Sequence, residues 1–465
     1  MTTKSFSLSE ILAVTERHPF YNAEIQYPPN AKEIQSAREW AANQRTKVEL
    51  HFQPLLHKNA MYKIVDRLMR DTSPENVYRE SSYMSITGGG SGGIPMMFAV
   101  DAHENRQQRA QMGKLLQLCG VISRKDWVLS LHTSGSFYRS LDLTTEIMEN
   151  AGATVLSAGS YMDLEEVIQA LAYYHVNVLT GDASQIVQLV CRISTLAAER
   201  QRQIRINKII YTSEPLTGAQ RSFIRATLGP IKICSVMGSA EAGPWTLTSP
   251  DLVGEENLNS SSMDFVFDTR DMVIEIVSPA SVDTENSPSD ISPLPLGETG
   301  IILQTSLRRL RNPLVRYITG DVGSLHPLPD MANAIVPESE RQYLRVLRMH
   351  GRDRRFSFKW YGCYFEFEKM NVLMQAEECG ILQWQVILDQ LDSSPQPTLE
   401  VRLLRTPSRP DVLSEEQLTQ RLKSFFVVLP ATEHAFSVVF VKDLGGFERS
   451  STAGKVINFV DRLYS

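Results

Sequence analysis

The chain has 465 residues, 42% of them hydrophobic, and a formal net charge of -6. A chain of this length and composition can bury several hydrophobic cores. Its small negative charge disfavours nucleic acid and membranes as partners. Its five cysteines form no Cys-x-x-Cys pair, which argues against structural zinc and favours a reducing compartment. No apolar run reaches membrane-spanning length and the N-terminus lacks the apolar core of a signal peptide, so we expect a cytoplasmic protein.

Residues from about 9 to 71 carry helical spacing without obvious strands, interrupted at Pro28 and Pro29, and residues 1–84 are predicted to form a helical lead-in. The next segment, residues 85–97, reads Ser-Ile-Thr-Gly-Gly-Gly-Ser-Gly-Gly-Ile-Pro-Met-Met and is predicted to be a glycine-dense loop. Because glycine permits positive φ angles, the backbone N–H groups of such a loop can surround phosphates. The Gly-Lys-Ser/Thr ending of a Walker loop is absent.

The same segment contains Gly89-x-Ser91-x-Gly93, which formally matches the nucleophile elbow of serine hydrolases. An elbow needs a strand before the serine and a helix directly after it, whereas residues 94–98 read as extended. A serine hydrolase is therefore one alternative hypothesis for this segment, and a plain flexible loop is another.

From Trp127 onward, short apolar runs alternate with helical patterns. Strands are predicted at residues 127–131, 153–156, 176–179 and 208–212, and helices at 141–150, 164–171, 182–199 and 217–228. This alternation predicts parallel strands with helices on both faces. Ligand clefts in such sheets lie at the carboxyl ends of the strands.

One carboxylate follows the next predicted strand. Ile231, Ile233 and Val236 indicate a buried strand, and the small residues from Gly238 to Glu241 follow it. A carboxylate between glycines suits a Mg²⁺ that carries nucleotide phosphates, because a hard cation prefers oxygen ligands and glycine lets the backbone approach closely. The alternative is an ordinary strand-to-loop exit with a solvated glutamate.

The rest of the chain indicates a β-rich part and a second domain. Residues 278–298 are rich in Ser, Pro, Asp and Glu and predict a surface loop or linker; residues 300–305 and 314–317 predict antiparallel strands. The basic cluster Arg308, Arg309 and Arg311 is interpreted as a solvated or locally paired surface. Beyond Gly351, strands at residues 399–404 and 436–441 and a helix at 414–426 predict a small α/β domain.

The predicted fold class is therefore α/β. A large N-terminal domain, residues 1–350, would contain mostly parallel doubly wound sheets at 85–270 and a β-rich subdomain at 271–350. A small, mobile α/β domain would follow at 351–465.

Several separated segments resemble, in order, motifs of the adenylate-forming enzymes, most closely the phenylacetate–CoA ligase branch. They are Thr87-Gly88-Gly89-Gly90-Ser91-Gly92, Thr212-Ser213-Glu214-Pro215-Leu216-Thr217, Gly238-Ser239-Ala240-Glu241-Ala242-Gly243-Pro244, Pro313-Leu314-Val315-Arg316-Tyr317-Ile318-Thr319-Gly320-Asp321, Gly351-Arg352-Asp353 and Arg449-Ser450-Ser451-Thr452-Ala453-Gly454-Lys455. The resemblance implies an adenylation core with a C-terminal lid that rotates about a hinge at the Gly351 segment.

The resemblance also implies a role for each segment. Lys455 would be the catalytic lysine and Glu241 the Mg²⁺ ligand. ATP would be bound by Thr87, Gly88, Gly89, Gly90, Ser91, Gly92, Ser213, Glu214, Pro215, Met237, Gly238, Ser239, Asp321 and Arg352. The acid would be bound by His132, Ser134, Phe137, Gly181, Ala242 and Gly243; for His132, a satisfied core histidine is the alternative.

The implied activity is ATP-dependent activation of a carboxylic acid, aromatic or small and polar, with pyrophosphate release and transfer of the acyl group to CoA. The chain departs from the family pattern in two places: Gly93 stands in the phosphate loop where a lysine is common, which bears on ATP binding, and Arg354 and Arg355 stand at the hinge in place of an acidic pair. The altered hinge motivates alternatives for the second half-reaction. The activated group could instead pass to an amine or a carrier protein, or the enzyme could activate a small oxyanion. A non-catalytic nucleotide-binding relative is a further alternative. The sequence leaves the oligomeric state open, a homodimer included.

Overall fold

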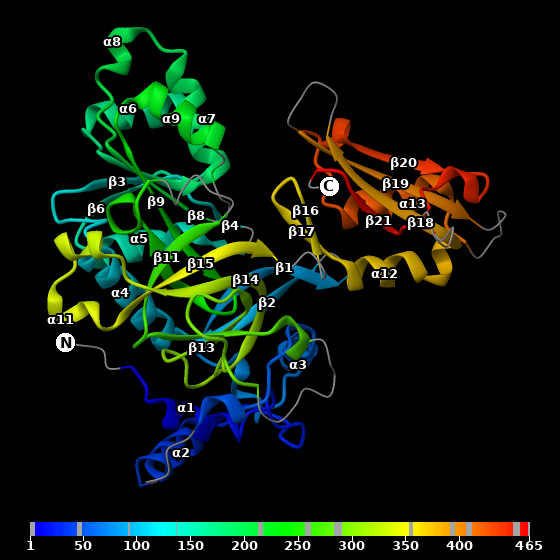
Figure 1. The fold of residues 1–465 in the computed structure, drawn as a ribbon, viewed down its shortest axis with the longest axis horizontal. Coiled ribbons are helices and arrows are strands. Elements are labelled where there is room, and N and C mark those ends of the chain that lie inside the picture. Colours follow the sequence, from blue (N-terminus) through cyan, green and yellow to red (C-terminus); the bar gives the residue numbers. More distant parts are fainter. Residues whose placement is uncertain are drawn as a thin grey trace. The chain divides into compact units, whose positions relative to one another are not determined.

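The computed structural model (Figure 1) describes residues 5–43, 49–91, 94–135, 137–212, 216, 218–255, 262–282, 291–352, 357–390, 396–405, 412–449 and 456–463, with side chains at 87–96, 184, 218–219, 352, 368 and 377 excepted. The chain divides into two compact units, Met1–Gly351 and Arg352–Ser465. Each unit has hydrophobic clusters drawn from its own residues. No helix among these residues has the length and apolar character needed to cross a lipid bilayer.

The first unit begins with the predicted helical lead-in. Its helices are α1 (Leu8–Thr15), α2 (Ala31–Asn43) and α3 (Lys58–Arg70). The Ser7 hydroxyl accepts the Glu10 N–H and the Glu10 carboxylate accepts the Ser7 N–H, a capping box that fixes the start of α1. Helices α1 and α2 close a core cluster with Leu310 and Val315, so the lead-in packs on a segment far away in sequence.

The glycine-dense segment is part of an antiparallel hairpin, where the sequence predicts a loop. Strand β1 (Ser82–Ser91) pairs with β2 (Ile94–Asp101), and Ser91 pairs with Ile94. The pairing register shifts between Ile86 and Gly90, at the start of the glycine run. A strand follows Ser91 where a nucleophile elbow needs a helix, so the hydrolase alternative is wrong.

Helix α4 (Ala102–Leu118) follows the hairpin and has no counterpart in the sequence predictions. The Asp101 carboxylate caps it by accepting the N–H groups of His103 and Glu104. Its buried face includes Glu104, Asn105, Gln108 and Arg109. These polar residues interrupt the apolar spacing by which a buried helix face is detected.

An eleven-stranded sheet organises the first unit, in the order β12-β13-β14-β15-β11-β10-β9-β8-β7-β3-β6. Its parallel half confirms the predicted α/β class. The parallel strands are β3 (Trp127–Ser130), β6 (Thr154–Ser157), β7 (Val178–Asp182), β8 (Lys208–Thr212) and β9 (Lys232–Ser239). The helices beside them are α5 (Ser140–Asn150), α6 (Leu164–Tyr173), α7 (Ala183–Ser194), α8 (Ala198–Gln201) and α9 (Gly218–Leu228).

Helices cover both faces of the parallel half, as predicted. Val128 and Val178 pack with α4 and α5 on one face, in a cluster that contains Met112 and Ile147. Leu129 and Leu179, one residue further along each strand, pack with α6, α7 and α9 on the other. This alternation follows from the two-residue period of a strand.

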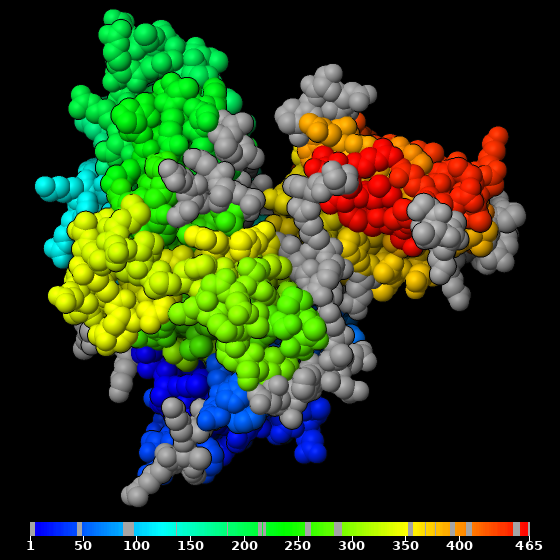
Figure 2. All heavy atoms as spheres, viewed as in Figure 1, coloured from blue at the N-terminus to red at the C-terminus, as the bar shows by residue number. Residues whose placement is uncertain are grey.

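The antiparallel half extends the same sheet, so the β-rich region is not a separate layer. Its strands are β10 (Gly243–Thr248), β11 (Met263–Asp268), β12 (Met272–Val277), β13 (Gly300–Ser306), β14 (Tyr317–Pro327) and β15 (Leu344–Arg352), with the short helices α10 (Pro250–Val253) and α11 (Glu338–Arg341). In the space-filling view this region, yellow-green to yellow, forms a continuous surface (Figure 2). The strand predicted at residues 314–317 begins only at Tyr317, because Arg316 has a φ of 46°.

A short hairpin, β4 (Ser134–Gly135) with β5 (Tyr138–Arg139), lies after β3 in the first unit.

The second unit is a small α/β fold around a four-stranded sheet of order β20-β19-β18-β21. Its elements are β16 (Ser357–Trp360), β17 (Cys363–Glu366), α12 (Phe367–Gln375), β18 (Ile381–Gln390), β19 (Pro397–Arg405), α13 (Glu415–Phe425), β20 (Phe436–Phe440) and β21 (Phe459–Asp461). The predicted strands at residues 399–404 and 436–441 and the helix at 414–426 are present.

Candidate functional site

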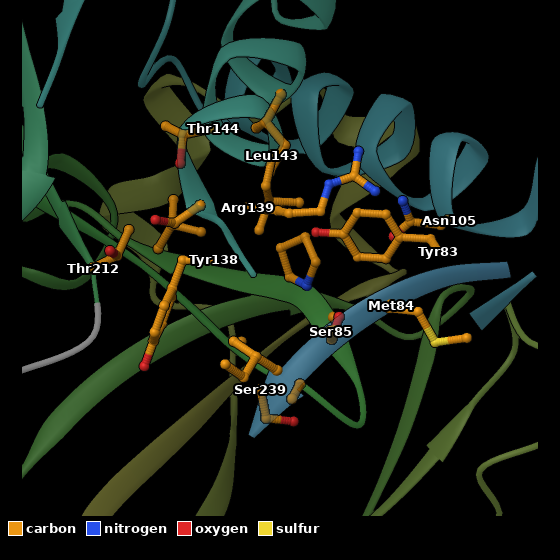
Figure 3. A pocket seen from close by; sticks show the side chains of 18 of the residues that line it. Tyr83, Met84, Ser85, Asn105, Tyr138, Arg139, Leu143, Thr144, Thr212 and Ser239 are labelled. Carbon is orange, nitrogen blue, oxygen red and sulfur yellow. The ribbon is translucent and has the colours of Figure 1, made fainter. Parts of the chain in front are cut away.

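A cavity of about 250 Å³ lies at the carboxyl edge of the parallel strands (Figure 3). Thr212 ends β8, and Val236, Gly238 and Ser239 lie at the end of β9; further lining residues come from α5 and β5. Its lining residues include Tyr83, Met84, Ser85, Asn105, Phe137, Tyr138, Arg139, Leu143, Thr144, Ile147, Thr212, Val236, Gly238, Ser239, Gly243, Pro244 and Arg309. The position agrees with the general placement of ligand clefts in α/β sheets.

A tight return from β9 into β10 forms one wall of the cavity. Ser239 pairs with Gly243 across the return, and the Ser239 Oγ accepts the N–H of Ala242 at 3.0 Å. A Cβ at Gly238 would lie 2.5 Å from the carbonyl oxygen of Gly243, and one at Gly243, where φ is 70°, would lie 2.6 Å from Gln108 Oε1. Both positions therefore require glycine.

This return carries Glu241, whose side chain is only 6% exposed. Its Oε1 accepts hydrogen bonds from the Tyr62 hydroxyl of α3 and, at 3.3 Å, from the Tyr317 hydroxyl of β14. Burial alone would raise the pKa of the Glu241 carboxyl, but the Lys58 charge and the Tyr62 hydrogen bond outweigh it and lower the pKa. The predicted metal ligand is therefore an ionised, hydrogen-bonded carboxylate, not the solvated glutamate of the alternative interpretation.

Replacing Tyr62 with phenylalanine should remove this buried hydrogen bond and destabilise the protein by about 1.5–3 kcal/mol at neutral pH, the usual range for a hydrogen bond to a charged group. A lowered carboxyl pKa contributes stability above the ordinary glutamate value of about 4.3, and this contribution is lost as the pH falls through the folded-state pKa. The difference in free energy of unfolding between wild type and Tyr62→Phe, measured by urea titration, should therefore become smaller in acid.

Tyr27→Phe, which removes a hydrogen bond of 2.7 Å to the solvated Asp71, is the matched control and should have the smaller effect. Equal losses in the two variants would contradict this role for Tyr62.

In the cluster Arg308, Arg309 and Arg311, the first two residues are buried and the third is partly buried, so its interpretation as a solvated surface is wrong, whereas ion pairs are present at Arg308 and Arg311. Arg308 is 6% exposed and forms an ion pair with Asp271; Arg309 is 1% exposed; Arg311 pairs with Asp101 at 3.1 Å. Beside them, both carboxylate oxygens of Glu104 accept the Leu310 N–H at 3.2 Å. Clustered arginines look solvated in sequence because their partners lie elsewhere in the chain.

Glu104 gives the protein a testable pH dependence. Burial and the Asp101 charge raise the pKa of its carboxyl to about 7, against the backbone donors and the Arg309 charge. The folded state then binds a proton that the unfolded state releases near pH 4.3, so stability falls as the pH rises from about 4.3 to about 7, by at most about 1.4 kcal/mol per pH unit. Glu104→Gln keeps an acceptor for the N–H groups and should lose this decline. Parallel stability–pH profiles of the two proteins would contradict the assignment.

Opposite the glycine return, two arginines flank the Tyr83 ring. The Arg109 and Arg139 guanidinium carbons lie 4.5 and 4.3 Å from its centroid, and Figure 3 shows Arg139 beside the ring. Asp142 pairs with both arginines at 3.0 Å, and Glu146 pairs with Arg109 at 2.7 Å. The stacked cations hold the tyrosine in the wall, and their charges are matched locally.

The structure brings some predicted site residues together. Phe137, Gly238, Ser239 and Gly243 line the cavity, and Phe137 has a φ of 67°. Ala242 is fully buried and does not line the cavity; its backbone carbonyl accepts a hydrogen bond from Gln108 Nε2 at 2.6 Å. Binding of a ligand by these residues stays a prediction.

Other predicted acid-binding residues are not in the cavity wall. His132 is wholly buried after β3, with Nε2 3.2 Å from Thr180 Oγ1 and Nδ1 3.6 Å from Asp182 Oδ1. Gly181 is buried near the end of β7, and Ser134 is exposed on β4. His132 is buried as the core-histidine alternative expects, but its Nδ1 has no hydrogen-bond partner among the described residues, so its role toward the acid stays a prediction.

Asp321 lies in an irregular stretch of β14. The pairing with β13 shifts between Ile318 and Val322, Gly320 has a φ of 77°, and the Asp321 N–H donates to Thr319 Oγ1 at 3.0 Å. Bulges of this kind redirect side chains. Asp321 does not line the cavity, and its predicted ribose contact stays a prediction.

The remaining predictions fall partly outside the described residues. Met237 is half-buried and packs against the core cluster that contains Trp245. Gly92, Ser213, Glu214, Pro215 and Lys455 lie outside the described residues, and of Thr87, Gly88, Gly89, Gly90, Ser91 and Arg352 the structure describes only the backbone.

Sequence reasoning missed much of the wall. Tyr83, Arg139 and Leu143 come from segments for which no role was predicted, although Arg139 directly follows the loop after β3 that was expected at the sheet edge. Tyr62 and Arg309 carry no local signal, because their contacts are with Glu241, far away in the chain.

No protein-family model and no curated protein sequence matches the chain. Solved structures do. A 2-hydroxyisobutyryl-CoA ligase in complex with 2-HIB-AMP and CoA matches with a TM-score of 0.63 and 16% identity, over 98% of this chain and 88% of the other. The amide bond synthetase McbA from Marinactinospora thermotolerans matches with a TM-score of 0.50 and 12% identity, over 97% and 92%. The chain therefore has the fold of adenylate-forming ligases. These structural matches do not single out the phenylacetate–CoA ligase branch.

Proposed function

We propose that this protein activates a carboxylic acid with ATP, forming an acyl adenylate and pyrophosphate, and then transfers the acyl group to CoA. The observation that carries the proposal is the cavity at the sheet's carboxyl edge, walled by the glycine return that holds the ionised Glu241. The proposal is also supported by the similarity of the fold to that of a CoA ligase, which extends over 98% of this chain.

In the proposed reaction a carboxylate oxygen of the acid attacks the α-phosphorus of ATP, and the bond from that phosphorus to the pyrophosphate oxygen breaks. Negative charge is spread over phosphorus oxygens in the transition state, so the enzyme acts mainly by positioning and by charge neutralisation. The acid would lie in the cavity against Tyr83, Phe137 and Leu143. The backbone of residues 87–92 would hold the phosphates, Asp321 the ribose hydroxyls, and Lys455 both the carboxylate and the α-phosphate.

Glu241 fits the ligand set of Mg²⁺. It is ionised, and two tyrosine hydroxyls orient one of its oxygens. The described residues contain no cluster of three His, Cys, Asp or Glu side chains that could hold a metal by themselves, so phosphate and water oxygens would complete the set. A bound Mg²⁺ would neutralise phosphate charge.

A second candidate acceptor is an amine, with no CoA involved. Arg354 and Arg355 stand at the hinge segment in place of the acidic pair expected for the family. The fold likeness to an amide bond synthetase is compatible with this alternative.

Pyrophosphate release tests the proposal. The purified protein is incubated with ATP, Mg²⁺ and a panel of aromatic and small polar acids, with and without CoA or an amine. Acid-dependent release that is followed by thioester formation supports the first candidate, and turnover with an amine in the absence of CoA replaces it by the second. No acid-dependent release from the wild-type protein would reject both.

A further inference from the structure

Only two charged side chains line the described part of the cavity wall, and both are arginines. Arg139 already has an anionic partner: its Nε and Nη2 donate to the two carboxylate oxygens of Asp142 at 3.3 and 3.0 Å. Arg139 is also half exposed, so solvent screens its charge. It has no need of a ligand.

Arg309 differs from Arg139 in each respect. It is 1% exposed, and its Nη1 donates to the backbone carbonyl of Glu241, a neutral acceptor. Its Nε is buried and has no hydrogen-bond partner among the described residues. A buried guanidinium with an unused donor is unfavourable, and an acceptor oxygen in the cavity would relieve this.

The carboxylates near Arg309 are occupied by other donors. Glu104 accepts the N–H groups of Leu310 and Arg311, and Glu241 accepts the tyrosine hydroxyls. The guanidinium of an arginine keeps its charge at neutral pH. Arg309 therefore places in the cavity wall a guanidinium with one unpartnered donor, which an acceptor oxygen of a ligand can match.

We propose that Arg309 binds the carboxylate of the acid substrate, and that the substrates are monocarboxylic acids with an apolar or aromatic body. This rests on the proposed adenylation. Tyr83, Leu143, Ile147 and Val236 provide the apolar wall for the body of the acid, and Arg139 is neutralised, so no cation remains for a second carboxylate. The hydrogen bond to Glu241 fixes Arg309 beside the residue expected to hold Mg²⁺, so the carboxylate would lie at the reacting end.

Equilibrium binding tests this inference without turnover. Benzoate and phenylacetate are titrated into the full-length protein by calorimetry, in parallel with benzamide and phenylacetamide, which keep the shape and lose the charge. The wild-type protein should bind each acid about 10- to 100-fold more tightly than its amide, the range expected for one charge-assisted hydrogen bond. Arg309→Gln should remove this preference, and Arg309→Lys should reduce it because lysine lacks the planar donor set.

Arg139→Gln is the matched control, since it removes the other arginine of the wall and should retain the preference for the acid. Circular dichroism establishes whether each variant is folded; if Arg309→Gln is not, the wild-type comparison of acid with amide and the Arg309→Lys variant decide the question. Equal binding of acid and amide by wild type, loss of the preference in Arg139→Gln alone, or weakening of ATP binding alone in the Arg309 variants would each overturn the inference. Acid-dependent pyrophosphate release that is insensitive to Arg309 would overturn it and leave the proposed function standing.

Discussion

Replacing Lys455 with alanine is expected to slow acyl-adenylate formation by about 10²–10³-fold, the range found when one group that stabilises transition-state charge is removed. A lysine at the end of a flexible stem can reach both the carboxylate and the α-phosphate, and its charge offsets the negative charge that develops on the phosphorus oxygens. ATP binding should change little, because most contacts with the nucleotide are expected from the first unit. Single-turnover pyrophosphate release and ATP titration measure the two quantities separately.

Lys442→Ala is the matched control for this experiment. Lys442 is an exposed lysine of the same unit, and its removal should leave the rate unchanged.

A second test is a protein truncated after Gly351. Among the described residues, the clusters of the first unit are built from its own side chains, so the truncated protein should fold and bind acid but not form adenylate. An unchanged rate in Lys455→Ala, or adenylate formation by the truncated protein, would show that this lysine is not the catalytic one.

The parallel half of the sheet could be predicted from the sequence because its signals are local. Each strand is a short apolar run between helical patterns, and the predicted strand at residues 208–212 coincides with β8. The antiparallel half was predicted as a separate subdomain, because nothing local indicates that the Gly238–Gly243 return joins β9 to β10 in one sheet. Pairing between distant strands is not contained in a short window of sequence.

The missed parts of the site share one physical cause. Helix α4 buries Glu104, Gln108 and Arg109, and each of them has at least one polar partner in a segment distant in the chain. Arg309 was likewise interpreted as surface because arginine is seldom fully buried. Buried polar residues are recognised only when their partners are known, and the partners come from the fold.

The position of Glu241 after a buried strand could be predicted from sequence, because a carboxylate between glycines there is a local pattern; its binding of Mg²⁺ stays a prediction. The structure adds what the pattern lacks, namely the two tyrosine donors and the Lys58 charge that keep the carboxylate ionised in a buried position. These contacts also determine which substitution tests its role most cleanly. Glutamine can accept the same tyrosine hydrogen bonds, so it removes the charge and retains the shape.

Glu241→Gln is therefore expected to remain folded and to lose Mg²⁺-dependent adenylation by about 10²–10³-fold at ordinary Mg²⁺ concentration, the loss expected when charge stabilisation of the transition state is removed. The amide oxygen is a weaker ligand for a hard cation than a carboxylate, so higher Mg²⁺ should recover part of the rate. Pyrophosphate release as a function of Mg²⁺ concentration measures the effect. Electron paramagnetic resonance of Mn²⁺ in the presence of ATP reports metal binding without turnover, and it should show weaker retention of the ion by the variant.

Glu104→Gln is the matched control above pH 7, where its carboxyl is ionised, because it replaces another buried glutamate of the same unit that has no predicted role toward the metal. Its Mg²⁺ dependence should follow that of wild type, even where its stability differs with pH. If both variants shifted the Mg²⁺ dependence equally, the effect would reflect the loss of buried charge in general. Normal activity of Glu241→Gln at ordinary Mg²⁺, with unchanged Mn²⁺ binding, would show that Glu241 does not bind the metal and that its carboxylate serves to anchor the hydroxyls of Tyr62 and Tyr317.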